Sequence, residues 1–257
     1  MNKAWLWLIL SAFILVSACM ELDDKKDEFK DQDTLSVNFS HYRTIRIINP
    51  VGRIYCTGDT LATRWHAYLT RSVKTDDQEQ AQLVMKRIRF NQSDRNDELT
   101  LEILMENDDK SIAACAFEFC IPCRMAVNLS TEVGDIILLH TRGETHLKSI
   151  TGNIQAEGIT ADQIDIESVT GSIAADFAAD SIPHWDIKLT TGAISCYIPK
   201  KVSAVVECRV TTGSIEARNL DLSDAEQSSS LLRWKNMQGE GTITLDLITG
   251  SISLTGY

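Results

Sequence analysis

The chain has 257 residues, of which 44% are hydrophobic, and this is enough to fill the core of one large domain or two small ones. Its net charge of -11 argues against duplex nucleic acid and anionic membrane surfaces as partners, because both repel an acidic protein. The composition therefore points to a globular protein whose partners are not polyanions.

The first residues have the pattern of a bacterial export signal. Lys3 supplies a positive charge, and the apolar run from Ala4 to Val16 is short for a membrane span, which needs about 20 residues. Small residues directly before Cys19 resemble a lipobox, in which the cysteine is lipidated and becomes the mature N-terminus. An ordinary signal peptide that contains a cysteine is the alternative. We predict a signal peptide over residues 1–18 and a lipid anchor on Cys19. By resemblance to enterobacterial lipoproteins, the absence of aspartate after Cys19 implies the outer membrane.

A highly charged segment follows the predicted anchor. Its sequence, MELDDKKDEFKDQD, holds only three large apolar residues and cannot bury enough surface to fold by itself. We therefore predict an acidic, solvated tether over residues 19–34 and a folded domain over residues 35–257.

The first part of that domain, residues 35–126, is irregular. The segment TIRIINPVGRIYCTG reads as a first coil, and the helix predicted over residues 75–88 begins with Thr75 and Gln78 in capping-box positions. Two strands around a polar turn are predicted over residues 87–105. We expect the helix and this hairpin to cover the exposed end of the domain, which would otherwise offer unpaired strand edges.

The second part, residues 127–257, repeats one short phrase. Glycines recur at intervals of 18, 19, 21, 21 and 37 residues, and an isoleucine stands two places after every one of them. These glycines are Gly134, Gly152, Gly171, Gly192, Gly213 and Gly250. Apolar residues also stand five and seven places before each glycine in most repeats, so strands lie on both sides of it.

This period predicts an all-β fold, a parallel β-solenoid of about six coils that turn at the glycines. The long last interval is explained by a polar insertion at about residues 219–240. An antiparallel sandwich is the alternative; it explains the alternation of apolar and polar residues but not the fixed columns.

These features together resemble those of the bacterial putative-adhesin family. The residues that carry the resemblance are an early NPVGRI, one helix, a hairpin, an Ile-Pro stretch at FCIPC and the repeated T-G-x-I, over about residues 35–257. The resemblance implies a cell-envelope protein with a β-solenoid fold and no established catalysis. The chain departs from the family pattern in its cysteines.

Six cysteines remain beside Cys19, and an even number in an exported protein suggests disulfides, with 15 complete pairings possible. Cys196 and Cys208 both fall in inward columns on the two strands of one predicted coil. We predict a disulfide between them, with free buried thiols as the alternative.

The other four cysteines are candidates for disulfides or a redox cluster. They are Cys56, Cys115, Cys120 and Cys123. Cys120 and Cys123 have the C-x-x-C spacing of disulfide exchangers, but such enzymes place the first cysteine at a helix N-terminus, and this segment reads as strand. Zinc would need four ligands, and the local cysteines supply three. Structural disulfides or buried thiols are therefore favoured, and we predict no metal.

Outward-facing acids form the candidate site for glycoside cleavage or for calcium. Asp165, Asp186 and Glu207 share one column, an arrangement similar to that of polysaccharide-cleaving β-helices with paired acids. The neighbouring column carries Lys148, Glu167, Lys188 and Arg209, and alternating charges of this kind usually make a solvated face. We predict no catalytic residue and no cofactor.

The sequence thus favours a non-enzymatic envelope lipoprotein that presents a solenoid for adhesion or scaffolding. Its partners would be the membrane, through the lipid, and an envelope protein or glycan. A sensory or regulatory component of the envelope stress response is the alternative, and a carbohydrate-active β-helix enzyme is a further one.

Overall fold

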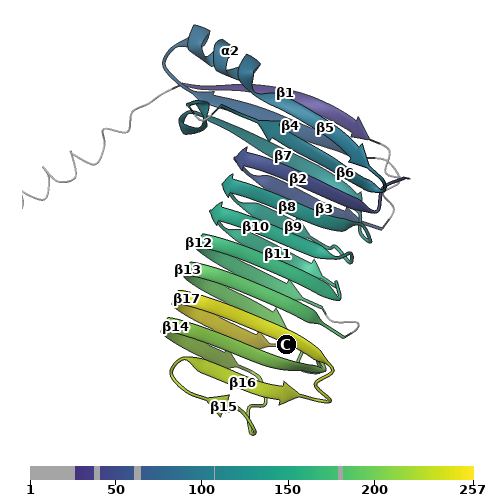
Figure 1. The fold of residues 1–257 in the computed structure, drawn as a ribbon, viewed down its shortest axis with the longest axis vertical. Coiled ribbons are helices and arrows are strands. Elements are labelled where there is room, and N and C mark those ends of the chain that lie inside the picture. The colour runs from purple at the N-terminus through teal and green to yellow at the C-terminus, as the bar shows by residue number, and fades with distance from the viewer. Residues whose placement is uncertain (1–26, 38–40, 61–64, 107, 179–181) are drawn as a thin grey trace, which may run out of the picture.

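The computed structural model describes residues 27–37, 41–60, 65–106, 108–178 and 182–257. The predicted signal peptide and Cys19 lie outside these residues. In the described part, one α-helix, α2, accompanies a single sheet of 17 strands (Figure 1). The predicted all-β class is confirmed. Among the described residues, no helix is both long and apolar enough to cross a membrane.

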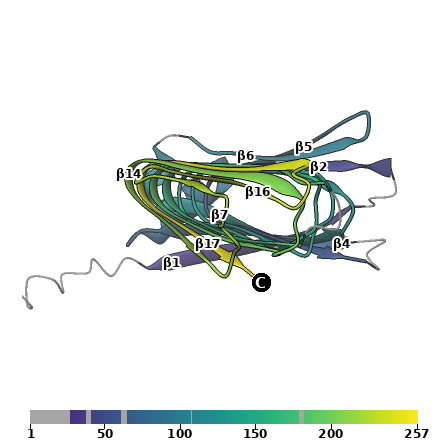
Figure 2. The same ribbon diagram turned by 90° about the horizontal axis from the view of Figure 1, so that it is seen from below.

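The middle of the sheet consists of parallel strands that bend back on themselves. In the four longest cases one strand runs through the bend: β12 (Gln163–Phe177), β13 (His184–Ile198), β14 (Ala204–Arg218) and β17 (Gly241–Gly256). In the other three the bend separates two strands: β2 (Thr44–Val51) and β3 (Ile54–Asp59), β8 (Ala126–Val133) and β9 (Ile136–Leu139), and β10 (Thr145–Thr151) and β11 (Ile154–Ile159). Seen along its long axis, the sheet curls into two facing layers (Figure 2).

Glycines occupy the bend in each of these repeats, in the column that the sequence period predicts. Gly192 pairs with Gly171 on one side and with Gly250 on the other. Its φ is +139°, a value that L residues with a side chain rarely adopt, and an added Cβ would lie 1.7 Å from the carbonyl oxygen of Gly171. The repeated glycine therefore allows both the bend and the close stacking of neighbouring strands.

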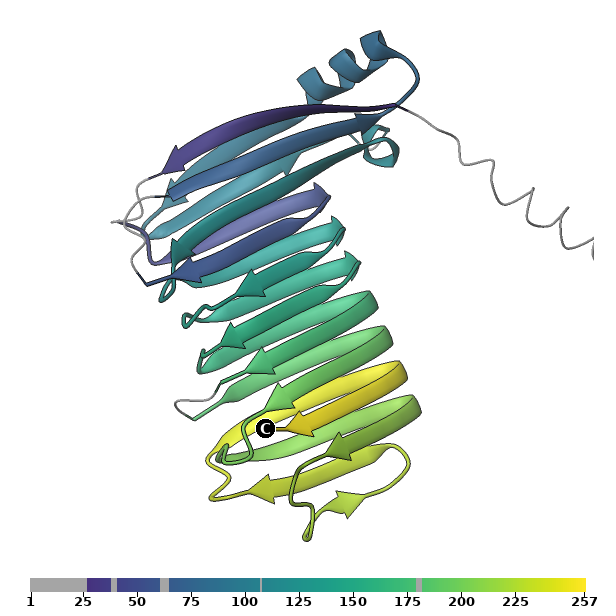
Figure 3. The same ribbon diagram turned by 180° about the vertical axis from the view of Figure 1, so that it is seen from behind.

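The strands do not stack in the order in which the chain makes them. β17 lies between β13 and β14, pairing with both in parallel, so the last repeat is not the outermost one. The outer edge of the first half of β14 is taken by β16 (Leu231–Asn236), which pairs with it antiparallel. The predicted winding of about six coils in sequence order therefore differs from the observed order (Figure 3).

The predicted insertion at about residues 219–240 forms the end of the sheet. It contains β16 and the two-residue β15 (Glu226–Gln227), which also pairs with β16 antiparallel. Three partly buried apolar side chains from it, those of Leu220, Leu222 and Ala225, pack against the core. The polar sequence thus covers part of the end of the core.

The N-terminal elements cover the other end of the sheet, and the predicted helix and hairpin are among them. They are β1 (Glu28–Val37), β4 (Trp65–Lys74), α2 (Gln78–Arg87), β5 (Arg89–Arg95), β6 (Glu98–Leu104), the 3-10 turn η2 (Asp109–Ser111) and β7 (Ala113–Pro122). The hairpin of β5 and β6 adds to β2, whereas β7, β4 and β1 continue from β3.

The helix begins two residues later than the capping-box prediction implies. Asp77 is the N-cap, and its carboxylate accepts a hydrogen bond of 2.8 Å from the N–H of Glu79. Thr75 instead donates its hydroxyl to Gln80 Oε1 at 2.6 Å. The apolar side chains of the helix and of its C-cap pack on the core, since Ala81, Val84 and Ile88 are buried.

The acidic segment predicted as a solvated tether is a strand from Glu28 onward. All ten residues of β1 pair antiparallel with β4. Arg71 on β4 places Nη2 2.7 Å from a carboxylate oxygen of both Asp31 and Asp33. Composition missed this strand because its partner supplies both the backbone hydrogen bonds and the compensating charge.

Candidate functional site

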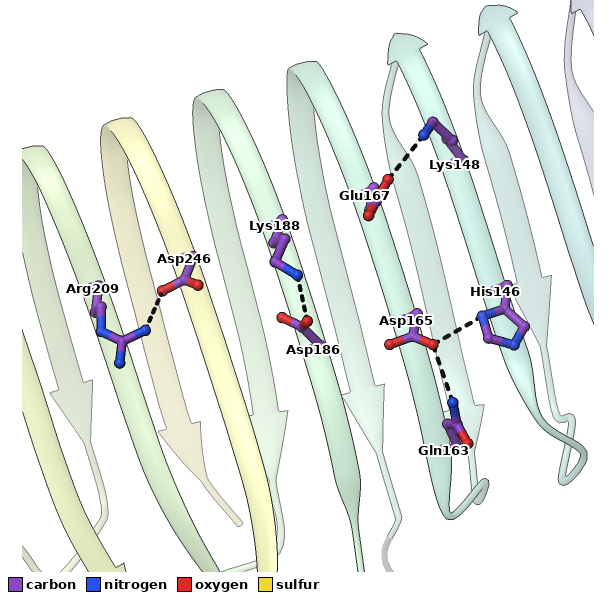
Figure 4. A network of polar contacts seen from close by, with 9 residues as sticks. All are labelled: His146, Lys148, Gln163, Asp165, Glu167, Asp186, Lys188, Arg209 and Asp246. Carbon is purple, nitrogen blue, oxygen red and sulfur yellow. Dashed lines mark hydrogen bonds and ion pairs between the residues drawn. The ribbon is translucent and has the colours of Figure 1, made fainter.

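Two outward columns of polar and charged side chains run across the strands of one layer, and we call them the charged ladder (Figure 4). The first column lies six residues before the glycines, and in spatial order it contains His146, Asp165, Asp186, Thr244 and Glu207. The second lies four residues before the glycines, and in spatial order it contains Lys148, Glu167, Lys188, Asp246 and Arg209. The ladder thus crosses β10, β12, β13, β17 and β14.

The position of β17 decides the order of charges in the ladder. In the second column it places Asp246 between Lys188 and Arg209, so that positive and negative side chains alternate over all five strands. In the first column it places Thr244 between Asp186 and Glu207. Sequence order alone puts Lys188 beside Arg209, and the contribution of Asp246 was therefore missed.

Ion pairs join neighbouring side chains along the ladder. His146 Nδ1 lies 2.9 Å from Asp165 Oδ2, and Lys148 Nζ lies 3.0 Å from Glu167 Oε2. Lys188 donates to Asp186 Oδ2 on the same strand at 2.5 Å, and this hydrogen bond raises the pKa of the lysine. These side chains are exposed, so each pair contributes little to stability by itself.

Arg209 joins the two columns at the far end of the ladder. It pairs with Glu207 on its own strand and with Asp246 on β17, where Nη1 lies 3.4 Å from Oδ1. The negative charge of Glu207 is the main cause that raises the pKa of Arg209. Arg233 on β16 lies 3.7 Å from Glu207 as well. Every acid of the two columns therefore has a basic partner.

The ladder borders shallow hollows on the same layer. One of about 410 Å³ lies among His146, Asp165, Asp186 and their neighbours. A second, of about 540 Å³, follows the column from Lys148 to Arg209. Its other side carries apolar side chains, and Val169 and Ile248 are 46% and 52% exposed. The layer thus offers a groove across the strands, with alternating charges on one side and apolar groups on the other.

The three acids considered for catalysis or calcium are not gathered into one site. Asp165 and Asp186 are neighbours, but Thr244 separates Glu207 from them. No group of three or more His, Cys, Asp or Glu residues in the described ranges is arranged to hold a metal ion. The geometry therefore supports a charged surface rather than a cation cage.

All six cysteines of the described part are free thiols in the structure. The disulfide between Cys196 and Cys208 is not formed in it, and β17 lies between the two strands that carry these residues. Burial raises the pKa of Cys196 well above its usual value, and raises that of Cys208 to about 12. The disulfide stays a prediction, and chemical modification of the thiols can test it.

The cysteines of the C-x-x-C segment do not form a dithiol pair on one surface. Cys120 points outward from β7 and is partly exposed, whereas Cys123 lies after the strand and is buried. Burial raises the pKa of Cys115 to about 12, and that of Cys56 well above its usual value. Raised pKa values oppose the thiolate form that redox exchange requires.

We expect iodoacetamide at neutral pH to modify Cys120 well before the other five thiols of the described residues, because among these six Cys120 alone is partly exposed. Peptide mass spectrometry after a time course would measure this order. Unfolding without a reductant should then expose all six. If Cys196 and Cys208 stayed unmodified in the unfolded chain, they would be bridged, as the sequence predicts.

The chain resembles solved structures in its fold. No family model matches the chain, and no curated protein matches it. Among solved structures, a putative cell adhesion protein from Clostridium sporogenes is similar, with a TM-score of 0.51 and 9% sequence identity, over 89% of this chain and 100% of the other. The likeness is one of fold.

Two further solved structures are similar over comparable lengths. A putative adhesin from Bacteroides fragilis has a TM-score of 0.33 and 12% identity, over 88% of this chain and 97% of the other. One from Parabacteroides merdae has a TM-score of 0.31 and 12% identity, over 87% and 96% of the two chains.

Proposed function

We propose that the chain is a non-enzymatic lipoprotein of the bacterial cell envelope that presents a parallel β-solenoid as a binding or scaffolding surface. The charged ladder is the observation that carries this proposal, because five adjacent strands hold alternating charges beside an apolar groove. Each strand is hydrogen-bonded on both sides in this layer, so a partner would meet a preorganised surface. The shared fold with the Clostridium protein is consistent with adhesion.

The spacing of the ladder suggests the shape of the partner. Neighbouring strands lie about 4.8 Å apart, so charges of one sign recur at roughly 10 Å along the second column. An extended polymer that crosses the strands could meet a side chain of the same charge on every second strand. An envelope glycan or an extended segment of an envelope protein has this form.

The lipid anchor on Cys19 and the outer-membrane location belong to the same proposal. Residues 20–27 would link the anchor to β1, which begins at Glu28. Attachment at this end would leave the charged ladder outside the membrane, on the layer that β10, β12 and β13 form.

The exchange Cys19→Ser should release the protein from the envelope, since lipidation requires the thiol. Most of the protein should move from the membrane pellet to the soluble fraction, as immunoblots of fractionated cells would show. Mass spectrometry of the unaltered protein should find the lipid on Cys19. An unmodified N-terminal peptide from membrane-bound protein would contradict the anchor.

Removal of two lysines from the ladder, Lys148→Ala with Lys188→Ala, should weaken binding to isolated cell envelopes roughly tenfold, because charge pairs across an interface are lost. Co-sedimentation at low and high ionic strength would measure the change. The matched control is Lys74→Ala with Lys86→Ala, two exposed lysines on β4 and α2, away from the ladder. Equal binding by both double variants would argue against the ladder as the binding surface.

A further inference from the structure

A separate hollow of about 500 Å³ lies on the layer opposite the charged ladder. It is formed by the second halves of β12 and β13 with the ends of β11 and β17, and Figure 3 shows the C-terminus on this layer. The lining residues are Glu157, Ala174, Ala175, Asp176, Tyr197 and Tyr257. None of the proposed interactions of the ladder uses them.

Two tyrosine rings line this hollow, and they remain exposed. The side chain of Tyr197 is 48% exposed and that of Tyr257 is 55% exposed. Tyr257 is nevertheless held at both ends, because its hydroxyl donates to the carbonyl oxygen of Phe177 at 2.8 Å and its N–H donates to that of Ile198 at 3.1 Å. The ring therefore crosses the end of β13 in a fixed position, and an exposed but fixed ring loses little entropy on binding a ligand.

The two carboxylates of the hollow differ from those of the ladder. In the described part of the chain, neither Glu157 nor Asp176 forms an ion pair, and no basic residue is among the six that line the hollow. Glu157 accepts a hydrogen bond of 2.5 Å from the amide of Gln155. Asp176 lies directly beside Tyr197, its partner in the pairing of β12 with β13. The hollow thus combines uncompensated negative charge with aromatic rings.

Small side chains leave the floor of the hollow open. Ala174 points outward between the strands that carry Glu157 and Tyr197, and it has no atoms beyond Cβ to occupy the space. A compact ligand can therefore approach the sheet between an aromatic wall and a carboxylate.

We propose that this hollow binds an organic ammonium group, such as a quaternary ammonium or the amine of an amino sugar or lysine side chain. Tyrosine rings attract a cation through their electron-rich faces, and the carboxylates of Asp176 and Glu157 supply the opposite charge. An uncharged sugar could stack on the rings but would leave both carboxylates without a cation. The charge of the ligand is therefore the property that the site selects.

A matched pair of probes tests the charge requirement. Choline and 3,3-dimethyl-1-butanol have the same shape, but the second carries a neutral carbon in place of the charged nitrogen. We expect titration of the full chain, in a maltoside detergent without choline headgroups, to give saturable choline binding that perturbs the NMR signals of Tyr197 and Tyr257. The neutral analogue should bind at least about tenfold more weakly.

Variants locate the site and separate binding from folding. Tyr197→Leu and Asp176→Asn should each weaken choline binding roughly tenfold, while Tyr68→Leu, at a 41%-exposed tyrosine on β4, should leave it unchanged. Thermal unfolding of each variant would check the fold, and Asp176→Asn keeps the test usable if the leucine variant is unstable.

Equal binding of choline and its neutral analogue would overturn the proposal, and so would binding of uncharged monosaccharides in the absence of choline binding. An equal loss in Tyr68→Leu would do the same. The site lies on the other layer from the ladder, so these results are independent of binding to cell envelopes by the lysine variants.

Discussion

The exchange Gly192→Ala is expected to destabilise the folded state by at least about 4 kcal/mol, in the exceptional range for a single substitution. The added Cβ would lie 1.7 Å from the carbonyl oxygen of Gly171 and 2.8 Å from its carbonyl carbon. Both atoms belong to the backbone of a strand hydrogen-bonded on each side, so neither can move without breaking the pairing. The φ of +139° adds strain for any residue with a side chain.

Gly239→Ala is the matched control for this exchange. Gly239 also has a positive φ, +65°, but it lies in the turn between β16 and β17, where the three atoms nearest to an added Cβ all belong to the side chain of Lys235. That side chain can move, so we expect a loss of about 1 kcal/mol. Urea unfolding would compare the two variants, and a similar loss in both would show that the stacked glycine column has no special packing requirement.

The glycine column also shows what the sequence could predict. A bend that repeats every 18 to 21 residues requires the same backbone conformation and the same close approach each time, and only glycine satisfies both. The inward isoleucines follow from the same constraint, because parallel strands in register place like residues side by side, as with Ile173 and Ile194. These features are local, and they could therefore be found without a structure.

The stacking order of the repeats could not be found in the same way. A period states how each repeat is built, but it does not state which repeats are neighbours when an insertion lets the chain return. β17 therefore moved Asp246 into the ladder, separated Asp186 from Glu207 and placed other residues beside Cys196 and Cys208. Charge patterns depend on neighbouring strands, so the order of charges in the ladder differs from the one that the sequence order implies.

The strand β1 and the tyrosine hollow were missed for a related reason. A charged segment such as EFKDQDTLSV becomes a strand only because β4 supplies its partner edge and Arg71. Tyr257 lies beyond the last repeat glycine by seven positions, and nothing in the sequence places its ring near Phe177. Sites formed by residues distant in the chain require the packing of the whole sheet.

The exchange Ile173→Ala is expected to destabilise the fold by about 4 kcal/mol, whereas Ile215→Ala should remove only about 1 kcal/mol. Both isoleucines occupy the same inward column. Ile173 is fully buried between Ile154 and Ile194, so alanine would leave a cavity that the paired strands cannot close. Ile215 is partly exposed and has Ile252 as a neighbour on one side.

The physical reason for this difference is that Ile215 lies at an unpaired edge of the sheet. Among the described strands, none pairs with the outer edge of β14 beyond Arg209, because β16 reaches only its first half. A side chain that already contacts water loses less transfer free energy on truncation and leaves a smaller cavity. Chemical unfolding of both variants would measure the gap of about 3 kcal/mol. Equal losses would mean that a further strand, from this chain or another, buries Ile215 in solution.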